Sequence, residues 1–163
     1  ALRLFKEAEK ARPNDVFILQ KIARQLSDSV HDTDDRERQQ ALLTEALEYS
    51  ERAVRLDPTN AVSVISVAVC QGKLATYAET RQKIAYSKLV KENAERALVL
   101  DPTYDWAHHI LGRWHYEMAS IGSTKRWFAK LIYSELPEAS FDRAVAALQR
   151  AVELSPQSVA HTL

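Results

Sequence analysis

ALRLFKEAEKARP, residues 1–13, sets a pattern that the rest of the chain repeats. Ala1, Phe5 and Ala8 lie twelve, eight and five residues before Pro13, so they share one stripe of a helix that the proline then ends. Small residues on such a stripe let a neighbouring helix approach closely. The same spacing recurs before three more prolines: Ala46, Ser50 and Ala53 before Pro58; Val90, Ala94 and Ala97 before Pro102; Ala144, Leu148 and Ala151 before Pro156. This recurrence indicates helical repeats.

A second stripe follows each of the first three prolines. An apolar and a small residue stand nine and ten positions later, at Ile22-Ala23, Val67-Ala68 and Leu111-Gly112, in what we take as the first helix of a hairpin. We therefore predict an all-α fold, an α-solenoid of about three enlarged hairpins. Their helices are expected over 15–28 with 36–56, 60–76 with 80–100, and 104–120 with 140–155; a helix over 1–12 precedes them, and another first helix begins near 157.

The spacing of the prolines is wider than in a simple repeat. They lie 45, 44 and 54 residues apart, whereas a tetratricopeptide repeat takes about 34 residues. The longest excess falls between 121 and 140 and contains Trp127, Phe128 and Leu131. Because an apolar segment of this kind packs against the rest of the fold and does not form a free loop, we predict an extra inserted helix near 124–134.

Composition agrees with one helical domain over residues 1–163. The chain is 46% hydrophobic, which is enough to fill a core, and its three glycines leave few tight β-turns. The 22 basic and 22 acidic residues balance, which argues against broad capture of nucleic acid or of an anionic membrane. The single cysteine, Cys70, lies in an apolar run and is expected to be a buried, inert thiol. No apolar run reaches the about 20 residues of a membrane span.

The first helices of the hairpins are expected to line a groove. Positions four, seven, eleven and fourteen after each proline should point into it, giving an apolar surface with one arginine toward each end of the stack. The candidate ligand-binding residues are Phe17, Arg24, Val62, Ile65, Val69, Trp106, His109, Arg113 and Tyr116. A guanidinium beside aromatic rings suits a carboxylate or phosphate. The alternative for Arg113 is a local pair with Asp105 or Glu117.

Other chemistry finds little support. His108, His109 and His115 lack the spacing of four, with an adjacent glutamate, that marks a helical zinc site, so we expect no metal site. The sequence shows no glycine-rich phosphate loop and no nucleophile elbow, and we expect neither catalysis nor a cofactor.

Several segments together resemble a known family. The first stripe matches the tetratricopeptide signature A-x3-F-x2-A-x4-P, most fully at residues 1–13. The enlarged hairpins, and the residues of 83–102, 106–117 and 127–140, resemble the regulator of microtubule dynamics family over about 36–156. One departure is His115, where members often carry cysteine.

The resemblance implies a non-catalytic, cytoplasmic adaptor associated with microtubules. Some members are held at membranes by a segment N-terminal to the repeats, and the same fold is associated with phospholipid handling. Because the chain begins at Ala1 without methionine, we expect a fragment. The resemblance implies that the N-terminal segment and a further C-terminal repeat of the family are missing from it.

A basic and aromatic run offers a second surface. Lys125, Arg126 and Lys130 are expected to face outward from the inserted helix, where they could meet an acidic tubulin surface or a membrane interface. The alternative is an ordinary amphipathic helix with a solvated face.

Two functions follow from these observations. The first is an adaptor or scaffold that binds a protein segment, with tubulin or microtubules as the family's partner. The alternative is a phospholipid-binding or lipid-transfer domain at a membrane contact site, with acyl chains against Val62, Ile65, Val69 and Trp106.

Overall fold

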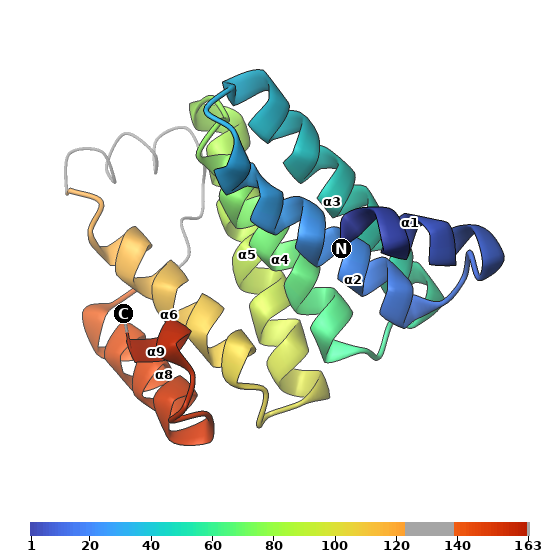
Figure 1. The fold of residues 1–163 in the computed structure, drawn as a ribbon. Coiled ribbons are helices and arrows are strands. Elements are labelled where there is room, and N and C mark those ends of the chain that lie inside the picture. The colour runs from blue at the N-terminus through green and yellow to red at the C-terminus, as the bar shows by residue number, and fades with distance from the viewer. Residues whose placement is uncertain (123–138, 163) are drawn as a thin grey trace. The chain divides into compact units, whose positions relative to one another are not determined.

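The computed structural model describes residues 1–122 and 139–162, and all regular elements in these ranges are helices (Figure 1). In chain order they are α1 (Leu2–Ala11), α2 (Val16–Asp28), a short 3-10 helix η1 (Ser29–Asp32), α3 (Arg36–Leu56), α4 (Ala61–Ala75), α5 (Thr80–Leu100), α6 (Asp105–Ala119), α8 (Phe141–Leu154) and α9 (Val159–Thr162). The predicted all-α hairpins are confirmed, with boundaries within about a residue. The helix expected near 124–134 lies outside the described residues.

The prolines end the helices in one recurring way. The residue before each repeat proline has left the helical conformation, with φ between −137° and −143° and ψ between 71° and 95°: Arg12, Asp57, Asp101 and Ser155. Proline disfavours the helical conformation in the residue before it, so α1, α3, α5 and α8 stop there. In two repeats a side chain caps the start of the next helix. Asp15 accepts a hydrogen bond from the backbone amide of Ile18 at the start of α2, and Asn60 accepts one from the amide of Ser63 at the start of α4.

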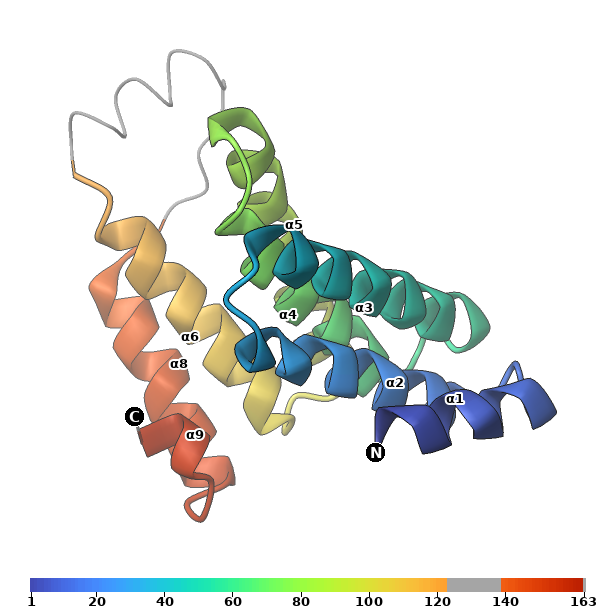
Figure 2. The same cartoon turned by 45° about the horizontal axis from the view of Figure 1, so that its top comes forward.

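The chain folds as two compact units, Ala1–Pro102 and Thr103–Leu163. In the first, each helix from α1 to α5 packs against the next, and α2 also packs against α4 (Figure 2). In the second, α6 pairs with α8, and α9 packs on α8. The single continuous domain expected over 1–163 stays a prediction.

The repeated small residues lie at the helix contacts, as predicted. The stripes of α3, α5 and α8 are buried at Ala46, Ser50, Ala53, Val90, Ala94, Ala97, Ala144 and Ala151, and Ala23, Ala68 and Gly112 are buried on the first helices. In α1, Phe5 and Ala8 are partly buried against a cluster that includes Ile18, Ile22 and Leu26.

Gly112 shows why the stripe needs small residues. A Cβ built there would lie 2.7 Å from Cγ of Leu148, closer than side chains tolerate, whereas one built at Gly72 would have its nearest neighbour, Cγ2 of Val90, at 3.7 Å. The backbone of α6 therefore approaches α8 at a distance that only glycine allows.

Cys70 is buried, as expected, with 2% of its surface exposed. Burial raises the pKa of its thiol to about 11, partly offset by the hydroxyl of Ser50. A thiol in this environment stays protonated and unreactive near neutral pH.

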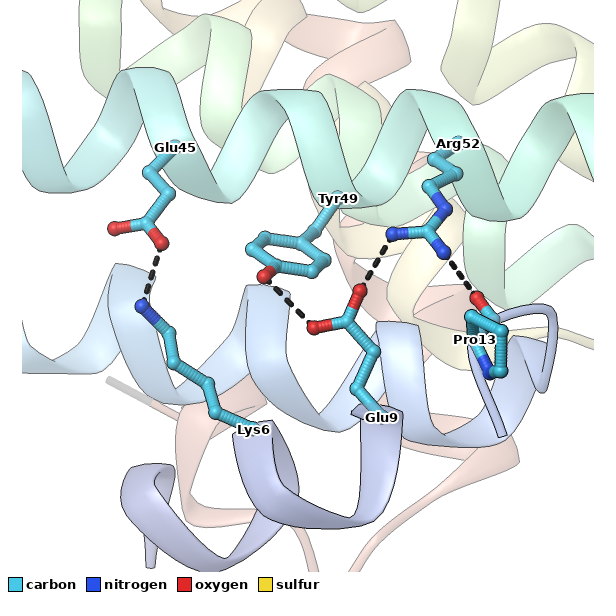
Figure 3. A network of polar contacts seen from close by, with 6 residues as sticks. All are labelled: Lys6, Glu9, Pro13, Glu45, Tyr49 and Arg52. Atoms are coloured by element: carbon cyan, nitrogen blue, oxygen red, sulfur yellow. Dashed lines mark hydrogen bonds and ion pairs between the residues drawn. The ribbon is translucent and has the colours of Figure 1, made fainter. Parts of the chain in front are cut away.

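Polar contacts tie α1 to α3 (Figure 3). Lys6 Nζ lies 2.6 Å from Glu45 Oε1, and the Tyr49 hydroxyl donates to Glu9 Oε2 at 3.0 Å. Arg52 pairs with the same Glu9 carboxylate at 2.5 Å and donates to the carbonyl oxygen of Pro13. Burial and then the hydrogen bond to Glu9 raise the pKa of Tyr49 to about 12. These contacts hold α1 against the first hairpin, which α2 and α3 form.

Candidate functional site

The first helices α2 and α4 lie next to each other in the first unit and are joined by side chains. Gln20 Nε2 donates to Asn60 Oδ1 at 2.9 Å and to Ser63 Oγ at 2.8 Å. At the other end, Lys73 Nζ donates to the carbonyl and hydroxyl oxygens of Ser27, both at 2.8 Å. The two helices therefore present a surface whose ends are fixed by hydrogen bonds.

Most of the candidate residues of this unit are accessible. Phe17 is 61% exposed and Val62 43% exposed, Arg24 is exposed, and Val69 is partly buried. Ile65 is only 3% exposed, so its side chain belongs to the core. Its position faces neighbouring helices, since Gln20 and His109, which also stand seven residues after a repeat proline, are partly buried too.

Basic side chains accompany the exposed apolar ones on α2. Lys21 Nζ lies 4.9 Å from the centre of the Phe17 ring, within the range of a cation–π contact. Arg24 Nε lies 3.7 Å from Asp28 Oδ2, and both side chains are largely exposed. Since exposed pairs of this kind are worth at most about 1 kcal/mol, a ligand carboxylate could replace Asp28 at low cost.

In the second unit, the four candidates lie along α6. Trp106, Arg113 and Tyr116 are exposed, and His109 is partly buried. The Trp106 ring packs edge-on against His109 at 5.4 Å between centres, and Tyr116 packs against Phe141 of α8 at 5.9 Å. Arg113 Nη2 lies 3.4 Å from Glu117 Oε1, so the local pair considered for it is present, between two exposed side chains.

A chain of polar side chains that joins α6 to α9 was missed by the sequence analysis. The side chain of His161, on α9, is completely buried; its Nε2 lies 2.9 Å from Asp105 Oδ2 and its Nδ1 3.2 Å from Nδ1 of His109. Its ring also packs against Trp106 at 5.3 Å between centres. The sequence did carry a signal for this burial, since the residue five after each repeat proline is buried: Ile18, Ser63, Ala107 and His161.

The environment shifts the pKa of two of these groups. Burial raises the pKa of Asp105, but hydrogen bonds from His161 and the Trp106 amide outweigh it and hold this pKa below its ordinary value. Burial, then the nearby His161 and Arg113, lower the pKa of His109. This chain of groups ends in the imidazole of His109, which can take up or release a proton.

The remaining candidates concern a metal site, a membrane span and the basic surface. His115 is buried against Trp114, and in the ranges 1–122 and 139–162 no three side chains of histidine, cysteine, aspartate or glutamate converge as metal ligands would. Within the same ranges no helix combines the length and apolarity needed to cross a membrane. The basic surface of Lys125, Arg126 and Lys130 lies outside the described residues.

Known proteins are similar to this chain in sequence and in fold. The family described as "Regulator of microtubule dynamics protein 1-3" matches residues 1–163. Regulator of microtubule dynamics protein 1 of Pongo abelii is 28% identical over 156 residues, which are 95% of this chain and 48% of that protein. The protein of the same name in Caenorhabditis elegans is 30% identical over 71% of this chain and 51% of its own length. The chain thus spans about half the length of these relatives.

Solved structures agree on the fold. A thermophilic TPR protein of Thermus thermophilus superposes with a TM-score of 0.69 at 21% identity, covering 95% of this chain and 64% of that one. MamA superposes with a TM-score of 0.58 at 20% identity, covering 95% of this chain and 67% of that one. The fold is therefore a tetratricopeptide-type helical repeat.

Proposed function

Since the chain belongs to the regulator of microtubule dynamics protein 1-3 family, we propose that it is a non-catalytic adaptor that binds a protein segment along its first helices. Phe17 and Val62 carry this proposal: both are large, apolar and exposed, on two adjacent helices that Gln20 ties together. Large apolar side chains exposed on adjacent, fixed helices support an interaction surface here.

The charges on α2 suggest the chemistry of the segment. Lys21 and Arg24 follow Phe17 along the helix, and Arg24 pairs with the exposed Asp28, which a ligand can displace. A segment with an apolar anchor followed by a carboxylate matches this order. On α6, the exposed Trp106, Arg113 and Tyr116 offer a second set of the residue types that dominate binding energies at interfaces.

We further propose tubulin or the microtubule as the partner and the cytoplasm as the location. The relatives' name, regulator of microtubule dynamics, supports this choice. Lys125, Arg126 and Lys130 form a proposed second contact, to an acidic tubulin surface.

Cosedimentation with microtubules tests the proposal. Replacing Phe17 and Val62 together by alanine should weaken binding about tenfold or more, because each removes a central anchor. Val99→Ala is the matched control, since Val99 is 82% exposed but lies on α5. Equal binding by the double variant and the unaltered chain, with both folded, would exclude the α2–α4 surface.

The basic surface has its own test. Neutralising Lys125, Arg126 and Lys130 should weaken microtubule binding and make the residual binding less sensitive to salt. The same variant is added to vesicles of anionic phospholipid. Unchanged binding in both assays would remove these three side chains from the proposal.

Lipid binding is the alternative outcome. The sequence predicts that an acyl chain would contact Val62, Ile65, Val69 and Trp106. Ile65 is in the core, so α4 would have to move before an acyl chain could reach its side chain. This burial favours a protein segment. Native mass spectrometry of the purified chain separates the two, because a near-stoichiometric phospholipid adduct would support lipid binding and a mass without adduct would support the adaptor.

A further inference from the structure

His161 places α9 against α6. Its side chain is fully buried, with one ring nitrogen 2.9 Å from Asp105 Oδ2 and the other 3.2 Å from Nδ1 of His109. All three residues belong to the second unit. Trp106 packs edge-on against both imidazoles, at 5.4 Å and 5.3 Å between ring centres, which limits their exposure to water.

The two facing nitrogens can share one proton but not two. When both rings are neutral, His161 donates from Nε2 to Asp105 and accepts at Nδ1 from His109. One added proton still fits, because a charged His161 donates from Nε2 to Asp105 and from Nδ1 to the unprotonated Nδ1 of His109. A second proton places two N–H groups and two positive charges face to face at 3.2 Å, with no acceptor between them.

We propose that Asp105, His161 and His109 form a pH-sensitive latch, which holds α9 on α6 near neutral pH and releases it when both imidazoles are protonated. This goes beyond the adaptor function and does not depend on any ligand. Because Trp106 and His109 are also proposed binding residues, release of α9 would uncover that part of α6.

The neighbouring charges oppose a second proton on the pair of imidazoles while α9 is docked. His109 faces Asp105 and Arg113 on its own helix and His161 on α9, so two of the three add positive charge when His161 is protonated. Ser155, just beyond the last turn of α8, which packs against α6 and α9, hydrogen-bonds Asp105 and adds no charge.

The direction of the pH dependence follows from His109. Its pKa is lowered while α9 is docked, mainly by burial, and release returns it toward the ordinary value of about 6.5. The released state therefore binds more protons, and docking, complete above this pH, weakens as the pH falls through it. Between the two pKa values the equilibrium should shift about tenfold per pH unit. Asp105 stays ionised in this range, since its pKa is held below the ordinary value of about 3.9.

Nuclear magnetic resonance of the full chain tests the latch. The nuclear Overhauser contact between the rings of His161 and Trp106 should be present near pH 7.5 and lost near pH 5.0, a range that spans ordinary histidine titration. The amides of α6 and α8 should keep their positions throughout. Persistence of the ring contact at the lower pH, or loss of α6 and α8 signals together with it, would overturn the proposal.

Two variants separate the latch from other acid effects. In His109→Asn the amide can still hydrogen-bond Nδ1 of His161 but cannot become charged, so the ring contact should survive at the lower pH. His31→Asn, at an exposed histidine of the 3-10 helix in the first unit, should behave like the unaltered chain. Equal acid release in His109→Asn and the unaltered chain would show that His109 is not the sensor.

Discussion

Arg96 donates from Nη2 to the carbonyl oxygen of Pro58 at 2.6 Å. This hydrogen bond ties α5 to the proline that follows α3. Arg52 makes the same contact to Pro13. Both arginines stand six residues before the next repeat proline. A guanidinium placed at the carbonyl end of the preceding helix is favoured there by the partial negative charge of that end. The contact is therefore a repeated feature of the first unit.

Replacing Arg96 by alanine should lower the free energy of unfolding by about 0.5–1.5 kcal/mol, the usual net value of one hydrogen bond. Arg81→Ala, at an exposed arginine near the start of the same helix, should change it by no more than about 0.5 kcal/mol. Urea unfolding followed by circular dichroism measures both. Equal effects of the two substitutions would mean that the contact to Pro58 adds nothing.

Gly112→Ala should destabilise the second unit by about 1–3 kcal/mol, because the new methyl group would overlap Leu148 and force α6 and α8 apart. In Gly72→Ala the methyl group has room, so the higher helix propensity of alanine should stabilise by up to about 1 kcal/mol. Thermal unfolding of the two variants beside the unaltered chain gives opposite signs if the close approach of α6 to α8 is real. A stabilised Gly112→Ala would contradict it.

Stability of the first unit should fall as the pH rises from about 10 to about 12, because the pKa of Tyr49 is about 12 in the fold and about 10 in the unfolded chain. The folded state holds the phenol proton more tightly, so the unfolded state loses it first. Tyr49→Phe should remove this component of the pH dependence. Tyr116→Phe, at an exposed tyrosine of the second unit, should keep it. Parallel stability–pH curves for Tyr49→Phe and the unaltered chain would rule out the assignment.

Cys70 should react with a thiol reagent near pH 8 at least about 100-fold more slowly in the folded chain than in urea. A pKa near 11 lowers the thiolate fraction by about that factor relative to a free cysteine, and burial slows access further. The reaction is followed by absorbance with a chromogenic disulfide. Rapid labelling of the native chain would show that α4 opens on the timescale of the reaction.

The groove residues show how far sequence reasoning reached. Phe17, Arg24 and Val62 are exposed and Ile65 is in the core, so Ile65 is excluded from the predicted groove, which stays a prediction for the other three. The residue seven after the proline is buried at Ile65 and partly buried at Gln20 and His109, so this position faces neighbouring helices. The pairing of His161 with Asp105 was missed because the two residues are 56 positions apart.

Where the helices begin and end, and which stripes they bury, could be read from the amino-acid sequence. Proline, capping residues and small side chains act within a few positions of the chain, so their effects are local. Helix packing, in contrast, determined that Ile65 is covered, that Arg96 reaches Pro58 and that His161 closes on His109. These outcomes depend on which helices become neighbours, because burial and hydrogen bonding between distant residues are set by tertiary contacts and not by local conformational preference.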